Sequence, residues 1–443
     1  MKCASPALRG NLPLCLSLLT TSICGTALAD ESASGFFEGA SFDVLSRNFY
    51  LNSDYRSPSP TGKSYRAEWA QGFISSFESG FTPGTVGFGA DAHAFSGLKL
   101  DGGKGHSGTG LLPVDSDGRS ASNYSSGGGA IKLNTSKTTL SFGEMMVETP
   151  VFDTADKRLQ PEYASGFLLN TREFDGTLLS AGHFTAFKNQ DSSSGKGNFS
   201  GYGATTDAGG ISFAGADLFT QSPAGGAIYA SELTDTWHQY YGNLHLKQSG
   251  MFIDANIYHT QETGEALAGA IDNTAYSLSG KYAIGAHGFT LAYQKIHGDT
   301  PFDFVGGDSI YLANSIKYAD FNGAGERSWQ LRYDLDLSTF GVPGLNFMTR
   351  YVKGSGIDGT HAPKGGAYNP FDPSLGEYVP QQGDGGRHWE RDIDMHYIVQ
   401  SGAAKGLSLQ VSHVSHRANA AQGGDDIDRL YMVIQYPLSF GPF

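Results

Sequence analysis

The sequence predicts an all-β protein, a transmembrane antiparallel up-and-down β-barrel. Three observations predict it: apolar and polar residues alternate along many segments, the apolar sets often end in aromatic residues, and short turns alternate with long polar stretches. Successive side chains of a strand point to opposite faces, so each alternating segment has one apolar and one polar face. A membrane barrel turns the apolar face to lipid and the polar face to a water-filled interior.

The first 29 residues have the form of a secretory signal peptide. Lys2 and Arg9 are basic, LPLCLSLLTTSIC is apolar, and Ala27-Leu28-Ala29 is a small-residue cleavage site. Cleavage after Ala29 leaves one domain, residues 30–443. A lipid anchor at Cys24 is the alternative, although Ile23 before it is bulky for such a site.

Composition narrows the class further. All three cysteines lie in the leader, so the mature chain has no disulfide and its fold alone must hold it together. Two of the 30 basic residues also lie in the leader, which leaves 28 against 44 acidic residues and argues against nucleic acid as a partner. No later segment approaches the roughly 18 uncharged apolar residues of a spanning helix. We expect export to the outer membrane of a Gram-negative cell.

The alternating segments can be followed along the second half of the chain. The clearest are 276–284, 288–294, 328–337, 344–352, 391–400, 406–412 and 429–443. In the last of these the apolar set is Leu430, Met432, Ile434, Tyr436, Leu438 and Phe440. A soluble sandwich would also alternate, but here the polar sets carry long charged groups on strand after strand, as a wet lumen requires. The last strand is expected to pair with the first, because an open edge in lipid leaves backbone groups unsatisfied.

Loops and strand number complete the prediction of the fold. Short turns at Gly176 and Gly285-Ala286 alternate with long polar stretches at 101–127, 188–200, 260–273 and 354–388. Short turns on one rim and long loops on the other are typical of outer-membrane barrels. Segmentation gives about 20 candidate strands, and such barrels have even numbers. Two weak candidates around 197–221 could be a single bent strand or a loop.

Many short stretches resemble one family in order along the mature chain. They are RNFYLN, QGFISSFESGFTPGTVGFG, LKLDG, SGTGLLPV, SFGEM, RLQPEYASGF, AGHFT, LAYQKIHGDTPFD, GGDSIYLANS, YADFNGAGERSWQ, GVPGLNFMTRY, VQSG, HRAN and YPLS. All resemble the OprD family of outer-membrane substrate-specific porins, and its basic amino acid and peptide branch in particular. The resemblance implies a barrel of about 18 strands whose inward-folded loops form a constriction, with one pore per chain and passive uptake of amino acids, small peptides or other small carboxylates.

The resemblance also carries implications for enzyme activity, cofactors and partners. It implies no enzyme activity, cofactor or metal. The expected partners are small solutes, outer-membrane lipid and lipopolysaccharide, the barrel assembly machinery, and other copies of the chain in a weak homo-oligomer.

The resemblance and the alternation together name candidate pore residues. In the family, arginines form a ladder that passes the substrate carboxylate along, opposite an electronegative pocket. Arg66 and Arg158 match basic positions, and the electronegative side corresponds to Ser315, Tyr318 and Asp320. The alternation itself turns further basic groups to the lumen: Arg332, Arg350, His396 and Arg429. A narrow passage focuses the field of such charges.

The sequence departs from the basic-substrate branch at several rungs. Ser53, Gln410, Ser412 and Tyr431 stand where those channels carry arginines, His396 stands for a lysine, and the loop at 304–307 is shorter. The thinned ladder predicts reduced attraction of anions and a less charged or differently shaped substrate. In the structural alternative, Arg332 and Arg350 pair with Asp334, Asp336 or Asp394 and stiffen the wall, and Asp308 and Ser309 shape a turn.

Other classes of function compete with a selective porin. A porin for aromatic or other organic acids is one alternative. A barrel enzyme would need a triad such as His183, Asp235 and Ser309, which come from distant segments without a nucleophile-elbow motif. His413 and His416 face opposite sides of a strand and make a poor metal pair. The acidic run 423–428 is either a solvated loop or a divalent-ion site, and a plugged structural or adhesion barrel remains the last rival.

Overall fold

The computed structural model describes residues 35–56, 64–102, 105–199 and 209–441. The expected leader, residues 1–29, lies outside the described residues, as does part of the segment 197–221. In the described part of the chain no helix is both long and apolar enough to cross a membrane.

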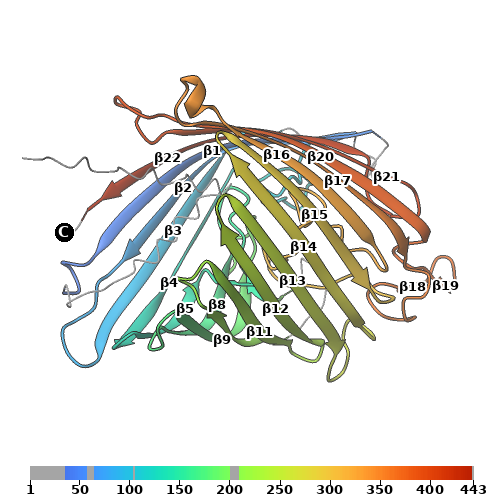
Figure 1. The fold of residues 1–443 in the computed structure, drawn as a ribbon, viewed down its shortest axis with the longest axis horizontal. Coiled ribbons are helices and arrows are strands. Elements are labelled where there is room, and N and C mark those ends of the chain that lie inside the picture. The colour runs from blue at the N-terminus through green and yellow to red at the C-terminus, as the bar shows by residue number, and fades with distance from the viewer. Residues whose placement is uncertain (1–34, 57–63, 103–104, 200–208, 442–443) are drawn as a thin grey trace, which may run out of the picture.

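The chain forms one closed antiparallel sheet of 18 strands, which confirms the predicted barrel (Figure 1). Its strands are β1 (Ser41–Tyr55), β2 (Tyr65–Glu78), β3 (Gly87–Asp101), β4 (Asn123–Thr135), β5 (Thr138–Met145), β8 (Tyr163–Thr171), β9 (Thr177–Lys188), β10 (Ile211–Leu218), β11 (Ala224–Leu233), β12 (Trp237–Gln248), β13 (Met251–Glu262), β14 (Asp272–Ile284), β15 (His287–His297), β16 (Arg327–Asp336), β17 (Leu345–Asp358), β20 (Asp384–Ile398), β21 (Ser408–Ala418) and β22 (Ile427–Phe440). The estimate of about 20 candidate strands was slightly high, because the described part of 197–221 holds a single strand of the sheet, β10. Two short pairs, β6 (Glu148–Thr149) with β7 (Phe152–Asp153) and β18 (Phe371–Asp372) with β19 (Glu377–Tyr378), lie in loops outside the main sheet.

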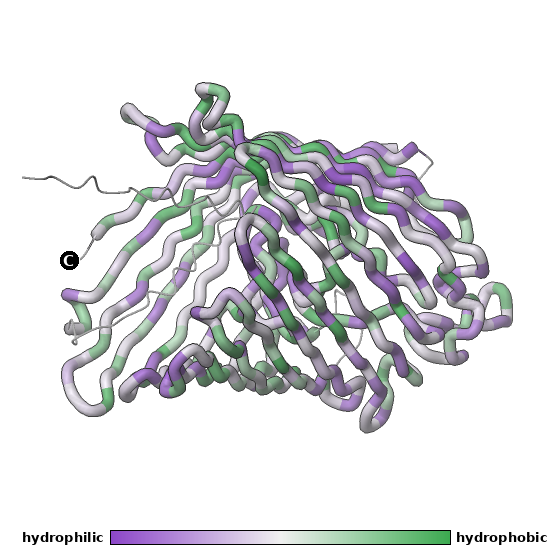
Figure 2. The backbone as a smooth tube through the Cα atoms, in the orientation of Figure 1, coloured by the Kyte–Doolittle hydropathy of each residue, from purple (hydrophilic) through white to green (hydrophobic). Residues whose placement is uncertain are grey.

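The last strand closes the barrel against the first, as its alternation predicts. β22 pairs with β1 from Phe42 opposite Phe440 to Tyr55 opposite Ile427. Its predicted apolar set points outward, where Met432, Ile434, Leu438 and Phe440 are exposed. The alternation of hydrophobic and hydrophilic residues is visible along the tilted strands in Figure 2. An unpaired strand edge in lipid would leave backbone groups without hydrogen bonds, and the pairing of β22 with β1 removes that edge.

The two rims differ in the length of their connections, as expected. On one rim the turns are short, and Gly176 and Gly285 take positive φ angles of 68° and 56°, which tight turns require. Residues 337–344, with the 3-10 helix η1 (Leu337–Phe340), form one of the longer connections there. On the other rim most connections are long, and this is the extracellular side in outer-membrane barrels. The predicted loops at 101–127 and 354–388 are shorter than expected, because β4 begins at residue 123 and β17 and β20 reach residues 358 and 384.

Two long connections on this rim fold into the lumen and contact each other. They are residues 146–162, between β5 and β8, and residues 298–326, between β15 and β16. The backbone nitrogen of Asp153 donates to the Ser309 hydroxyl at 2.7 Å, and the Tyr311 hydroxyl donates to the Asp153 carboxylate at 2.7 Å. Buried aromatic residues of both loops and the wall pack around them, among them Phe152, Tyr258 and Phe302. The sequence predicted inward loops through the family resemblance but did not single out these two ranges.

Candidate functional site in the lumen

The two inward loops and the wall of β16, β17, β20, β21, β22 and β1 enclose a cavity of about 320 Å³. It is lined by charged and polar side chains from both loops and from the wall. The predicted residues in its lining are Arg158, Ser315, Arg332, Arg350 and His396. Arg66, Tyr318, Asp320 and Arg429 are not in the lining. The lining also holds residues that the sequence analysis did not select, among them Arg47, Lys157, Asp308, Lys317 and Asp394.

The wall arginines occupy one cross-strand row. Following paired residues from β16 to β2 gives Arg332, Arg350, Asp392, Val414, Arg429, Ser53 and Arg66. Arg66 is the second residue of β2, at the long-loop rim, whereas Arg332 is sixth in β16, counted from the same rim. Strands in such barrels tilt by about 35–45° to the barrel axis, so a row that crosses the strands climbs along the pore. The register therefore places the arginines of one row at successive depths along the pore.

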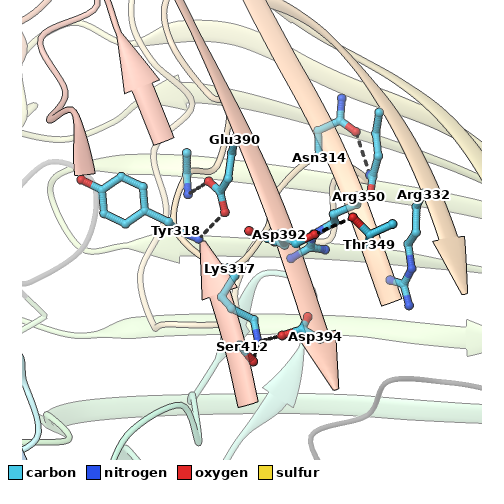
Figure 3. A network of polar contacts seen from close by, with 12 residues as sticks. Asn314, Lys317, Tyr318, Arg332, Thr349, Arg350, Glu390, Asp392, Asp394 and Ser412 are labelled. Carbon is cyan, nitrogen blue, oxygen red and sulfur yellow. Dashed lines mark hydrogen bonds and ion pairs between the residues drawn. The ribbon is translucent and has the colours of Figure 1, made fainter. Parts of the chain in front are cut away.

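The two lower arginines of this row are paired with carboxylates. Arg332 donates from two nitrogens to Asp334, at 2.7 and 3.1 Å. The Arg350 Nε donates to Asp392 at 2.7 Å. Arg332 thus has one of the partners foreseen in the structural alternative, and Arg350 has a partner on the neighbouring strand that was not among those foreseen. Figure 3 shows Arg350 beside Asp392 on the wall.

Charged residues also fasten the loop 298–326 to the wall. The Lys317 ammonium donates to Asp394 and to the Ser412 hydroxyl, each at 2.8 Å (Figure 3). The Glu390 carboxylate accepts from the backbone nitrogens of Tyr318 and Ala319 at 3.0 and 2.8 Å. Because Glu390 is fully buried, these two donors take the place of the water it has lost.

The loop 146–162 is fastened by a second set of ion pairs. Arg47 on β1 donates to the Asp156 carboxylate from two nitrogens and to the Arg158 carbonyl at 2.7 Å. Lys157 pairs with Asp308, which joins this loop to residues 298–326. Asp308 was expected only to shape a turn, but it lines the cavity as part of this pair.

Three predicted arginines have no carboxylate partner within the described residues. Arg158 lines the cavity and donates only to the carbonyl of Lys157, at 2.9 Å. Arg66 donates to the Gly108 carbonyl at 3.1 Å and lies 5.4 Å from the Tyr55 ring. Arg429 lies 4.3 Å above the Tyr318 ring and donates to the Tyr431 hydroxyl at 3.3 Å. The Nε atoms of both Arg66 and Arg429 are buried without a hydrogen-bond partner.

The predicted electronegative side lies on the loop 298–326. The Ser315 hydroxyl lines the cavity and donates to Asp320 at 2.7 Å. Burial raises the pKa of Asp320, and the bond from Ser315 partly offsets that rise. Burial also raises the pKa of the Tyr318 hydroxyl to about 12, while Arg429 lowers it. The Tyr318 phenol therefore stays neutral in ordinary buffers and contacts Arg429 through its ring.

The substituted rungs of the ladder lie close together on the wall. Ser412 is opposite Tyr431, and Gln410 is opposite His396. The His396 Nε2 is 2.7 Å from the Ser408 hydroxyl. This part of the cavity is consequently polar and carries fewer fixed positive charges than an arginine ladder would.

The residues considered for other chemistries do not come together. His183 contacts Ser212, whereas Ser309 contacts Asp153 and Val305, so the suggested triad is not assembled. The His416 ring is buried in the wall and its Nε2 is 2.8 Å from His388. In the acidic run 423–428, Asp428 is not a solvated residue, because it forms ion pairs with Arg417 and Arg56. No group of three metal-binding side chains occurs in the part of the chain that the structure describes.

A closed membrane barrel with a charged, loop-lined constriction defines a channel protein. A family model for the outer membrane porins of the OprD family matches residues 34–440, and the chain belongs to that family. It is 44% identical over 433 residues to Porin D of Pseudomonas aeruginosa, which covers 94% of this chain and 95% of the relative. It is 32% identical over 415 residues to the porin-like protein GalP of Pseudomonas putida, which covers 92% of this chain and 94% of the relative.

Solved structures agree with this assignment. OccK9 (OpdG) of Pseudomonas aeruginosa superposes with a TM-score of 0.82 at 34% identity, and OpdK of the same organism, determined with vanillate, superposes at 0.80 and 36%. Each match covers 92% of this chain and 100% of the other. The chain is therefore an outer-membrane β-barrel porin, as its sequence motifs indicate.

Proposed function

We propose that this porin conducts small solutes that carry a carboxylate: amino acids, small peptides or other small organic acids. The observation that carries the proposal is the division of the lumenal cations into paired and unpaired groups. Arg47, Lys157, Lys317, Arg332 and Arg350 each have a carboxylate partner. Arg66, Arg158 and Arg429 have no such partner within the described residues, and we expect their guanidinium groups to attract a passing anion.

The proposed passage begins at the rim end of the cross-strand arginine row and continues to the inward loop 146–162. A carboxylate meets Arg66 and Arg429 at the long-loop rim and then Arg158 at the cavity. An arginine binds a carboxylate with two parallel hydrogen bonds, which selects this group over a neutral amide. At an effective dielectric constant of about 20, unit charges about 4 Å apart attract by roughly 4 kcal/mol, and the solvated lumen reduces this further. Such a site is strong enough to select a solute and weak enough to release it.

The positive end of an amino acid has a matching surface. Ser315 lines the cavity, with the Asp320 carboxyl behind it. Burial raises the pKa of Asp320, and the Ser315 hydroxyl stands between this carboxyl and the cavity, so we expect the pocket to favour hydrogen-bond donors over strong cations. This agrees with the expectation of a less charged substrate than in the basic-amino-acid branch.

Aromatic acids are the second candidate. The neighbouring structure of OpdK was determined with vanillate. His396, Gln410 and Ser412 line the cavity of this chain in place of longer cations, and we expect this polar wall to leave room for a flat ring.

A liposome-uptake panel tests the proposal. Purified protein is reconstituted, and entry of matched pairs is measured: an amino acid and its amide, a dipeptide and its amide, benzoate and benzamide. Each carboxylate is expected to enter several-fold faster than its amide. Equal rates within every pair would refute the proposal, and the ranking of the three carboxylates separates its two candidates.

A further inference from the structure

The lipid-facing side of the barrel carries an asymmetric set of cations. Near the long-loop rim, five consecutive strands turn basic side chains outward: Lys295, Arg327, Lys353, Arg387, Arg391 and Arg417. On the other barrel strands that the structure describes, lysines and arginines alternate with exposed apolar residues and so point inward; Lys132 next to Ile131 is an example. Cations facing lipid are unfavourable unless they lie near the interface or meet an anion. The sequence pattern therefore marks one sector of the wall.

Four of these cations surround Trp389 on β20. Lys353 and Arg417 lie directly opposite Trp389 on the two neighbouring strands. Arg387 and Arg391 lie two residues to either side on β20 itself, facing the same way. Residues at these positions are about 5–8 Å apart across a sheet, a spacing that a phosphate group can bridge. We refer to Lys353, Arg387, Arg391 and Arg417 as the Trp389 cluster.

Most of this positive charge is uncompensated. Arg417 pairs with Asp428 at 3.0 Å and lies 5.8 Å from the Trp389 ring. Lys353, Arg387 and Arg391 are exposed, and none of the described residues offers them a carboxylate. The nearby aromatic side chains are placed as in an interfacial girdle: the rings of Tyr351 and Trp389 are 5.7 Å apart, and those of Tyr293 and Trp329 are 4.6 Å apart. The cluster therefore lies at the level of lipid headgroups.

An apolar groove in the outer wall leads to this cluster. It has a volume of about 650 Å³ and is lined by one cross-strand row, Gly280, Leu291, Leu331, Tyr351 and Arg391, together with the row below it. A Cβ added at Gly280 would meet no atom within 4 Å, so this glycine opens the wall. The groove ends at Arg391, which is itself part of the Trp389 cluster. An acyl chain in the groove would bring its headgroup to the cations.

We infer that the Trp389 cluster and this groove form a binding site for the phosphorylated glycolipid of the outer leaflet, lipopolysaccharide. The cations are at the extracellular rim, where this lipid lies, and several guanidinium groups suit the several phosphates of its sugar core. The apolar groove suits one of its acyl chains. The inference concerns the outer wall and holds whichever solute the lumen conducts.

Native mass spectrometry of the purified, delipidated barrel tests the inference. Wild-type protein is titrated with lipopolysaccharide, with the same lipid after enzymatic removal of its phosphates, with phosphatidylglycerol and with inorganic phosphate. The variant Lys353→Gln/Arg387→Gln/Arg391→Gln is expected to bind lipopolysaccharide about tenfold more weakly, since three charge-assisted contacts are lost. The control Lys137→Gln/Arg172→Gln/Lys405→Gln removes equal charge from the short-turn rim and is expected to bind like wild type.

Several results would overturn the assignment. They are equal binding by the triple variant and wild type, equal binding of phosphorylated and dephosphorylated lipid by wild type, or equally tight binding of phosphatidylglycerol. A change in oligomeric state with unchanged lipid binding would instead assign the cluster to an interface between copies. Should the triple variant fail to fold, the wild-type comparison of lipids and the single variant Arg391→Gln still decide the question. Solute uptake by the folded variants is expected to equal that of wild type, which separates this inference from the proposed function.

Discussion

The lumenal arginines differ in what they can do because they differ in their partners. Arg332 and Arg350 are each bound by a carboxylate on the wall, at 2.7 Å. Such a pair is rigid and nearly neutral, and removing one partner leaves a buried charge without compensation. Arg158 lines the cavity and forms no ion pair within the described residues, so under the proposed function its charge acts on the solute.

Arg158 therefore offers the clearest single-residue prediction. Arg158→Gln removes one charge-assisted contact, worth about 1 kcal/mol in a solvated site, and is expected to raise the half-saturating concentration of carboxylate solutes about fivefold. Uptake of the matched amides is expected to change little. Arg158→Lys keeps the charge and is expected to restore part of the difference. An equal fall for carboxylates and amides would mean that Arg158 only shapes the pore.

Sequence alternation turns Arg332, Arg350 and Arg429 to the polar face of their strands, since strand geometry alone decides the side. It cannot tell which carboxylate each arginine meets. Arg350 meets Asp392, opposite it on β20, because the register between β17 and β20 sets the pair, and the register is a property of the folded sheet. The contact of Lys317 with the wall was not predicted, because nothing in the sequence places a loop residue against Asp394, which lies 77 positions further along the chain.

At the scale of elements, the two inward loops are held together by the buried contact of Asp153 with Ser309 and Tyr311, and the strength of this contact depends on pH. Burial raises the pKa of Asp153 well above its usual range, and Asp308 and Glu148 add to that rise, while Tyr311 and Lys157 lower it. The carboxyl is therefore favoured in its neutral form when the loops are joined. The contact contributes fully below the ordinary pKa of an aspartate, about 3.9, and is lost as pH rises through the raised value.

This predicts that the constriction fluctuates more as pH rises. Single-channel recordings across a pH series are expected to show open-state noise growing with pH in wild type. Asp153→Asn resembles the neutral carboxyl, and its noise is expected to depend much less on pH. A wild-type record without pH dependence, or a variant with the same dependence, would contradict the role assigned to Asp153.

The strands yield a prediction that compares adjacent residues on opposite faces. Leu278 lies in the middle of β14 and is 54% exposed on the outer wall, whereas Ser279 next to it faces the lumen. Leu278→Lys is expected to lower the free energy of unfolding by about 2–4 kcal/mol, because it puts a charge into the bilayer, and Ser279→Lys to lower it by less than about 1 kcal/mol. Denaturant titration in lipid vesicles measures both. Similar losses would mean that the two faces are wrongly assigned.

Strand positions and strand faces were predictable because their periodicity is local, and β22 follows its predicted pattern along its length. The long inward loops were harder to predict. Residues 298–326 lack periodicity, and their course depends on distant contacts such as that between the Tyr318 backbone nitrogen and Glu390 at 3.0 Å. The acidic run 423–428 illustrates the same limit, since Asp428 finds Arg56 at the far end of the chain.

At the scale of the whole molecule, one closed wall separates lipid outside from a charged lumen inside. Among the described residues, the lumenal cations Arg47, Lys157, Lys317, Arg332 and Arg350 are paired with carboxylates, whereas Arg66, Arg158 and Arg429 form no ion pair. The account therefore predicts a conducting channel with a modest preference for anions, weaker than a complete arginine ladder would give.

Single-channel recording in a planar bilayer under a salt gradient tests this claim most directly. The wild-type protein is expected to insert in unitary conducting steps, with a reversal potential shifted towards that of the anion. The variant Arg66→Gln/Arg158→Gln/Arg429→Gln is expected to conduct as well, with most of that shift removed. Absence of current would identify a plugged barrel, and an unchanged reversal potential in the variant would show that these arginines do not govern permeation.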